Sequence, residues 1–146
     1  MTIAVVSNIF FIVIGEGPLW KSLQNRIINE KIANVKLLGK RFDIPQWLCA
    51  ADIFLFPSIY EGLGIVAIEA QSNGLPVLST DSIPEEADMK MGLFHRIPLK
   101  YIERWNKMLR DTLVPADVRQ QKTEEAMNSK YNISVVVKGV EDIYMS

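Results

Sequence analysis

The stretch Asp52-Ile53-Phe54-Leu55-Phe56-Pro57-Ser58, followed closely by Glu61-Gly62-Leu63-Gly64-Ile65-Val66-Ala67-Ile68-Glu69, contains the strongest fold signal in this chain. Its first half is an apolar run typical of a buried strand, and its second half changes to a helical pattern from Ile65 onward. No other stretch combines glycines, carboxylates and a change from strand to helix. We therefore expect a βα unit here, and a ligand bound at the turn between its two halves.

Strand-like runs alternate with helical patterns on both sides of this stretch. The runs at 8–14, 35–38, 52–56 and 76–79 predict strands, and Leu93-Phe94 marks a weaker fifth one. Helical patterns cover 19–32, 44–51, 65–73, 99–109, 115–128 and 133–144. This alternation indicates parallel strands joined by helical crossovers. The expected fold is α/β: a Rossmann-like parallel sheet flanked by helices, with a helical C-terminal tail, in a single domain over residues 1–146.

Composition narrows the possible partners and compartment. The chain has 146 residues, 49% of them hydrophobic, which is enough for one domain with a core. Its 16 Lys+Arg and 17 Asp+Glu give a net charge of −1 with no basic block, so we do not expect a nucleic-acid partner. Cys49 is the only cysteine. A buried thiol and a reducing, cytoplasmic location are therefore expected.

The beginning of the chain is apolar but does not predict a membrane helix. The run from Met1 to Ile14 is shorter than the roughly 20 residues that a spanning helix needs. We interpret its end as a buried strand. Because a buried parallel strand needs neighbours on both sides, we expect that upstream sequence is missing and that the chain is a fragment.

The turn between residues 57 and 64 has the features of an anion site. In open parallel sheets, ligands bind beyond the carboxyl ends of the strands, and this turn follows such an end. Gly62 and Gly64 allow the backbone to approach a ligand closely. The first N–H groups of the Ile65 helix have no intrahelical partners, so they can bind a diphosphate.

The two glutamates suit different parts of one ligand. Glu61 precedes the helix and is expected to point into the cleft, where an ionised carboxylate accepts hydrogen bonds from sugar hydroxyls. Glu69 lies on the helix among apolar residues, so we expect it to be partly buried and to need donors such as a ribose diol. Spacing alone leaves an alternative open: the glutamates are solvated or favour the helix dipole, and the glycines serve only the turn.

The motif resembles the Glu-x7-Glu donor-site signature of family GT4, the retaining glycosyltransferases with a GT-B fold. The similarity extends from Ile12 to about Glu86 in the order of that family. It includes Val13-Ile14-Gly15-Glu16-Gly17-Pro18-Leu19, Val35 to Gly39, Ala50-Ala51-Asp52 and Gly74-Leu75-Pro76-Val77. Three further segments resemble the polysaccharide-assembly branch more weakly: Ile83-Pro84-Glu85-Glu86, Trp105 and Tyr131-Asn132-Ile133.

The resemblance implies a C-terminal donor-binding domain and a role for each motif residue. Glu61 would be the catalytic-site residue that holds hydroxyls of the transferred sugar, and Glu69 would bind the ribose. The base would lie near Arg41. The remaining donor-binding residues would be Ser58, Gly62, Leu63 and Gly64, and the amides of the last three would face the sugar and the diphosphate. No cofactor and no metal are expected.

The resemblance also implies a reaction and its partners. A sugar would pass with retention from a nucleotide-sugar, by default a UDP-sugar, to a growing polysaccharide or lipid-linked acceptor. The setting would be capsule or exopolysaccharide synthesis at the inner face of the membrane, with peripheral membrane association of the full enzyme.

Two parts of the family pattern have no counterpart before Asn8: a strand whose loop carries an Arg/Lys pair, and the acceptor-binding N-terminal domain. The chain alone is therefore expected to bind nucleotide-sugars weakly and to be inactive or nearly so. The alternative is a non-catalytic binding subunit, or an inactive fragment, that needs a separate chain to complete the site.

Overall fold

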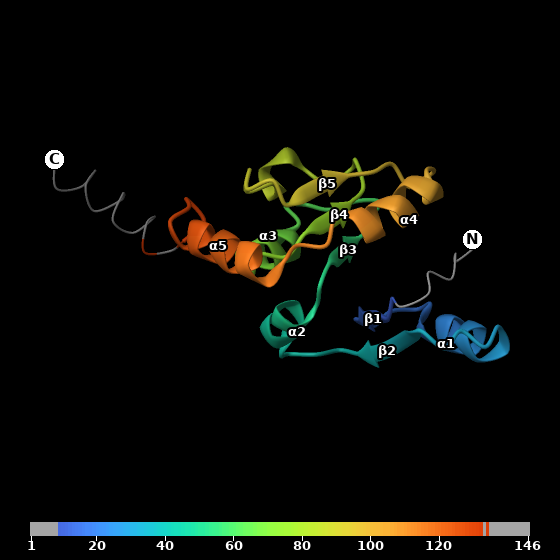
Figure 1. Ribbon diagram of the computed structural model, residues 1–146. Helices are drawn as coiled ribbons and strands as arrows, with labels where there is room; N and C mark the ends of the chain where they lie inside the picture. Colours follow the sequence, from blue (N-terminus) through green and yellow to red (C-terminus); the bar gives the residue numbers. More distant parts are fainter. Residues whose placement is uncertain (1–8, 133, 135–146) are drawn as a thin grey trace, which may run out of the picture. The chain divides into compact units, whose positions relative to one another are not determined.

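The computed structural model describes residues 9–132 and residue 134, and the chain divides into two compact units after Ile44. Figure 1 shows the course of the chain. The expectation of a single domain stays a prediction. The last helix expected from the sequence, at 133–144, lies outside the described residues apart from residue 134.

The first unit is a βαβ element with parallel strands. Strand β1 (Phe11–Ile14) is followed by helix α1 (Trp20–Asn29) and strand β2 (Val35–Gly39). The strands pair in parallel with Phe11 opposite Val35, as the crossover pattern predicts. No residue between 9 and 44 is fully buried. Several large apolar side chains of this unit are exposed, namely Phe10, Ile12, Val13, Leu19, Leu23, Ile28 and Phe42.

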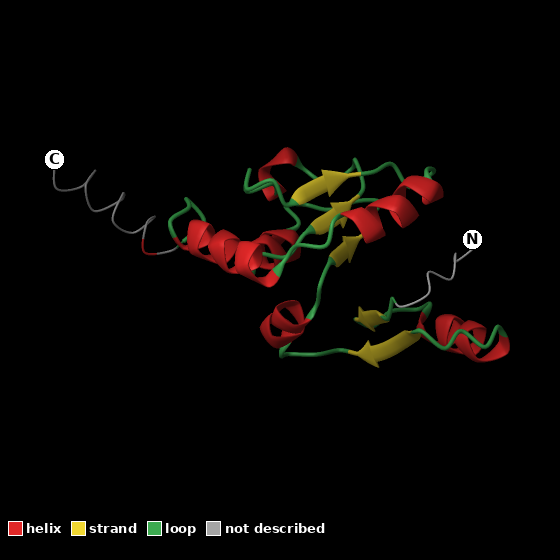
Figure 2. Ribbon diagram, viewed as in Figure 1, coloured by secondary structure: helices red, strands yellow, loops and turns green. Residues whose placement is uncertain are grey.

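The second unit contains a three-stranded parallel sheet. Strands β3 (Phe54–Phe56), β4 (Val77–Ser79) and β5 (Phe94–Arg96) lie in the order β3-β4-β5, and their arrows point the same way in Figure 2. From residue 44 onward, the described helices are α2 (Ile44–Ala50), α3 (Ile65–Ser72), the short 3-10 helix η1 (Glu85–Ala87), α4 (Ile102–Asp111) and α5 (Ala116–Met127). The α/β fold with parallel strands flanked by helices is therefore confirmed.

The core of this unit is built around its central strand. Residues 75–80 are all almost completely buried, because β4 has a strand on each side and helices packed against it. Helix α3 contributes Ala67 and Ala70, and helix α4 contributes Trp105 and Leu109. Burial of each large apolar side chain in this core, such as Leu109, contributes roughly 1.5–3 kcal/mol to stability.

A fully buried glutamine joins α3 to the segment that follows β4. The Gln71 amide nitrogen donates to the carbonyls of Ala67, at 2.9 Å, and Ala87, at 2.7 Å. Its amide oxygen accepts from the backbone N–H of Met89 at 3.0 Å. A buried amide group without partners costs about 1–3 kcal/mol, so these bonds hold η1 against α3. The composition of α3 alone does not predict this contact.

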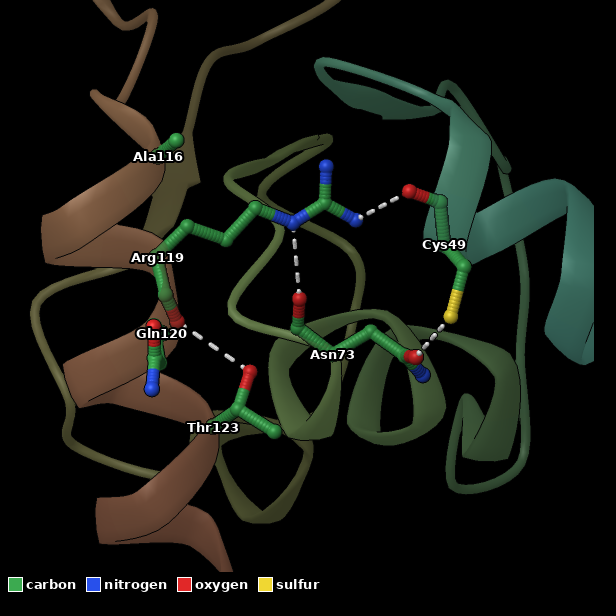
Figure 3. Close-up of a pocket in the computed structure, with 6 residues that line it drawn as sticks. All are labelled: Cys49, Asn73, Ala116, Arg119, Gln120 and Thr123. Carbon is green, nitrogen blue, oxygen red and sulfur yellow. Dashed lines mark hydrogen bonds between the residues drawn. The ribbon is translucent and has the colours of Figure 1, made fainter.

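Arg119 of α5 joins three helices through backbone carbonyls (Figure 3). Its guanidinium donates to Leu48 at 2.8 Å, Cys49 at 2.9 Å, Ala51 at 2.6 Å and Asn73 at 3.0 Å. These carbonyls lie at the C-terminal ends of α2 and α3, where helices have acceptors without intrahelical partners. One side chain therefore caps two helix ends and fixes α5 beside them.

Replacing Arg119 by Met should lower the free energy of unfolding by about 2–4 kcal/mol, because it leaves partly buried carbonyls without donors. Urea unfolding followed by tryptophan fluorescence measures this. Arg110→Met on the exposed face of α4 is the matched control, with an expected change within about 0.5 kcal/mol. Equal losses for both variants would contradict the capping role.

Candidate functional site

The loop from Pro57 to Gly64, here called the β3–α3 loop, lies where the sequence places it. It follows the carboxyl end of β3 and leads directly into α3. The neighbouring strand β4 runs in the same direction, so the segment 80–84 leaves the sheet at the same edge. A hydrogen bond from the Thr80 hydroxyl to the Ser58 carbonyl shows that the two loops meet. Both therefore contribute to one candidate site.

Glu61 is half-buried, and a neighbouring hydroxyl orients it. The Ser58 hydroxyl lies 2.9 Å from Oε1 of Glu61 and 3.0 Å from the carbonyl of Tyr60. A serine hydroxyl has one proton, and an ionised carboxylate is the stronger acceptor. Ser58 therefore touches the proposed catalytic-site residue directly, which gives it an orienting role that the sequence did not specify.

The glycines of the loop differ in their surroundings. Gly62 and Leu63 are exposed, whereas Gly64 is buried with φ of 75° and is the N-cap residue of α3. A Cβ atom at Gly64 would lie 3.2 Å from the Phe56 ring. Within the described part of the chain, no side chain caps this helix start. The first amides of α3 are thus available to an anion next to Glu61.

Glu69 is exposed, so the expectation of a partly buried carboxylate is wrong. The buried face of α3 is formed by Ala67, Ala70 and Gln71. At 100° per residue, Glu69 and Ile65 lie on the opposite face, and Ile65 is itself 62% exposed. Glu69 therefore needs no buried partner, and the desolvation argument for a bound ribose no longer applies. Its ribose-binding role stays a prediction.

Arg41 belongs to the first unit, where it is exposed and bonded to an acid. Its guanidinium donates to both carboxylate oxygens of Asp43, at 2.8 and 2.6 Å. The hydrogen bonds that Arg41 donates to Asp43, followed by the charge of that carboxylate, raise the pKa of Arg41 above its usual value. The role of Arg41 toward a nucleotide base stays a prediction.

A surface pocket lies elsewhere in the second unit, around Arg119. It is lined by Cys49, Asn73, Ala116, Arg119, Gln120 and Thr123, from α2, α5 and the end of α3 (Figure 3). Residues of the β3–α3 loop do not line it. The Arg119 guanidinium already donates to four backbone carbonyls, so we assign this pocket a structural role.

The pocket also corrects the expectation for Cys49. The thiol is exposed rather than buried, with Sγ 3.0 Å from Oδ1 of Asn73. In helix α2 the buried side chain is Leu48, so the adjacent residue turns away from the core.

The structure also bears on metals, membranes and His95. Within 9–132 and 134, no three His, Cys, Asp or Glu side chains are grouped to hold a metal ion. None of the helices described is both long and apolar enough to cross a bilayer.

His95 lies in β5, where burial lowers its pKa and the charge of Asp88 opposes that shift.

Sequence reasoning missed Thr80 and Ser82 as members of the site. Both hydroxyls contact the backbone of the β3–α3 loop. One signal could have found them: Ser79-Thr80-Asp81-Ser82 follows β4 just as Pro57-Ser58 follows β3. Polar residues at the carboxyl ends of adjacent parallel strands are expected to meet.

Gly64→Ala should lower the free energy of unfolding by about 1–3 kcal/mol, since its backbone is left-handed and its Cβ would crowd Phe56. Gly62→Ala is the control, because a Cβ there meets no atom within 4 Å. Its stability should stay within about 0.5 kcal/mol of the unsubstituted chain. Thermal or urea unfolding of both variants tests this, and a stable Gly64→Ala protein would refute the packing argument.

Comparison with known proteins adds an independent line of evidence. The family profile "Glycosyl transferases group 1" matches residues 3–111, which is more than half of the chain. The chain is 31% identical over 136 residues to the putative glycosyltransferase EpsF of Bacillus subtilis, covering 82% of this chain and 35% of EpsF. It is 40% identical over 72 residues to an Escherichia coli protein named UDP-Gal:alpha-D-GlcNAc-diphosphoundecaprenol alpha-1,3-galactosyltransferase, covering 47% of this chain and 18% of that protein.

A solved structure supports the same assignment. The crystal structure of WaaG, a glycosyltransferase involved in lipopolysaccharide biosynthesis, matches with a TM-score of 0.63 and 28% identity. That match covers 80% of this chain and 32% of WaaG, so the chain spans about a third of the length of such relatives. The parallel α/β architecture agrees with the GT-B glycosyltransferases. The sequence and fold together show that this chain belongs to the glycosyl transferases group 1 family.

Proposed function

We propose that this chain binds a nucleotide-sugar donor, in the first instance a UDP-sugar, as the donor domain of a retaining GT4-type glycosyltransferase. One observation carries the proposal. The Glu61 carboxylate is held by Ser58 directly before the uncapped start of α3, at the carboxyl edge of a parallel sheet. This arrangement puts a hydroxyl acceptor beside an anion site, as a sugar diphosphate requires.

The chemistry follows from the atoms that the loop presents. Ser58 engages Oε1 of Glu61, so the other carboxylate oxygen can accept a hydrogen bond from a sugar hydroxyl. The amides of Gly62, Leu63 and Gly64 face the sugar and diphosphate in this proposal. The exposed Glu69 accepts from the ribose hydroxyls.

The wider reaction is proposed from the relatives. The E. coli relative is named for UDP-Gal and an alpha-D-GlcNAc-diphosphoundecaprenol acceptor, and WaaG is involved in lipopolysaccharide biosynthesis. By analogy, the sugar goes to a polysaccharide or lipid-linked acceptor in capsule or exopolysaccharide synthesis. The site works without a metal or cofactor at the cytoplasmic face of the membrane. A second domain supplies the acceptor site.

A second candidate is a non-catalytic nucleotide-sugar-binding subunit. One observation favours it: neither the β3–α3 loop nor the segment 80–84 contains a lysine or arginine. The charge on a departing diphosphate is usually stabilised by cations or by several hydrogen-bond donors. A different segment or a separate chain must therefore provide these groups. The two candidates differ in what completes the site. An acceptor-binding domain encoded in frame upstream of Met1 favours the enzyme, and an independent ribosome-binding site there favours the separate subunit.

The two glutamates should have separable effects on affinity. Glu61→Gln should weaken UDP-glucose binding about tenfold and leave UDP binding unchanged, because a lost charged hydrogen bond costs about 1.5 kcal/mol. Glu69→Gln should weaken both ligands equally, because the ribose is common to them. NMR titrations of the 146-residue chain measure these constants.

Glu103→Gln on the exposed surface of α4 is the control and should change neither constant. Unchanged UDP affinity in Glu69→Gln would refute the ribose assignment. Equal losses for UDP and UDP-glucose in Glu61→Gln would refute the sugar assignment.

A further inference from the structure

Thr80 links the central strand to the β3–α3 loop. It directly follows β4, and its side chain is almost fully buried, at 1% exposure. Its backbone N–H donates to the Phe56 carbonyl at 3.3 Å and extends the β3–β4 ladder by one bond. Its hydroxyl donates to the Ser58 carbonyl at 2.5 Å. The loop is therefore attached to the sheet by a buried side chain beyond the last ladder bond.

Ser82 closes a small network of hydroxyls around the same carbonyl. Its Oγ lies 2.7 Å from the Thr80 hydroxyl and 3.0 Å from the Ser58 carbonyl. The carbonyl oxygen has two lone pairs, and the two hydroxyls have one proton each. With the Thr80 proton on the carbonyl, the Ser82 proton goes either to that carbonyl or to Thr80. The 2.7 Å separation of the two hydroxyl oxygens requires a proton between them, so the arrangement with the Ser82 proton on Thr80 satisfies the network.

The network leads to the carboxylate through a single residue. The Ser58 carbonyl is held by Thr80 and Ser82, while the Ser58 hydroxyl donates to Oε1 of Glu61 at 2.9 Å. Within the described part of the chain, Ser58 is the residue that donates to this carboxylate. The direction of the Glu61 side chain thus depends on contacts made from the next strand.

We propose that Thr80 and Ser82 are positioning residues that hold Ser58 and, through it, the Glu61 carboxylate in a binding geometry before the donor arrives. The proposal rests on the proposed function and adds residues to the same site. A glutamate side chain loses substantial rotamer entropy when a ligand fixes it, and prior ordering removes that cost from binding. The expected effect is therefore on sugar affinity, not on nucleotide affinity.

Four variants separate this role from simple core stability. Thr80→Val keeps the shape but removes the hydroxyl, and Thr80→Ser keeps the hydroxyl. Ser79→Ala is the matched control: Ser79 is also fully buried, but its hydroxyl donates to the Thr80 carbonyl, outside the loop. Ser82→Ala changes an exposed residue of the network and serves if Thr80→Val does not fold.

The first measurement needs no ligand. Amide hydrogen exchange by NMR should become about fivefold faster at residues 60–63 in Thr80→Val, since the loop loses its attachment. Ser82→Ala should have a smaller effect in the same place. Exchange there should stay within about twofold of the unsubstituted chain in Thr80→Ser and Ser79→Ala. If Thr80→Val and Ser79→Ala give the same exchange rates in the loop, the proposal is overturned.

The second measurement uses UDP-glucose and UDP as probes. Thr80→Val should weaken UDP-glucose binding three- to tenfold, which is the loss expected for one positioned hydrogen bond, and should leave UDP binding unchanged. Thr80→Ser should restore the affinity for UDP-glucose. If Thr80→Val loosens the loop but leaves the ratio of the UDP-glucose and UDP dissociation constants unchanged, the network does not position Glu61. If the unsubstituted chain binds neither probe, the proposed function fails, while the exchange experiment still decides whether the network holds the loop.

Discussion

The parallel pairing of β3 with β4 is the constraint on which the rest of the site depends. Phe54 lies opposite Val77, and Phe56 opposite Ser79, so both strands end at the same edge of the sheet. Two loops that are 22 residues apart at Ser58 and Thr80 are thereby brought into hydrogen-bonding contact. Because both loops begin at a rigid strand, a carboxylate on one can be oriented by hydroxyls on the other.

Buried polar groups define how the surrounding helices meet this sheet. Gln71 uses both ends of its amide to hold η1 beside α3, and Arg119 binds carbonyls at the ends of α2 and α3. Such groups are costly when unsatisfied, so they favour one arrangement over others of similar apolar burial. The loop that carries Glu61 ends on α3, which both of these side chains hold. Its order follows from polar contacts as well as from the apolar core.

Much of the fold could be predicted from the sequence because local patterns report local structure. The apolar run before Pro57, the glycine at 64 and the helical spacing after it give the βα unit directly. The exposures of Glu69 and Cys49 were predicted wrongly, because periodicity identifies a helix but not which of its faces meets the sheet. In α3 the small residues Ala67 and Ala70 pack inward, and the larger Ile65 stays exposed. A simple rule that apolar size indicates burial fails there.

The sequence by itself determined the order of strands and helices, the family, and the residues of the glycine loop with its two glutamates, since each of these depends on residue type and spacing along the chain. The tertiary structure alone decided that Ser58 touches Glu61 and that Thr80 and Ser82 hold the Ser58 carbonyl. The physical reason is that hydrogen bonds of side-chain hydroxyls are short and directional. Their partners are set by strand register and loop geometry, which spacing along the chain does not specify.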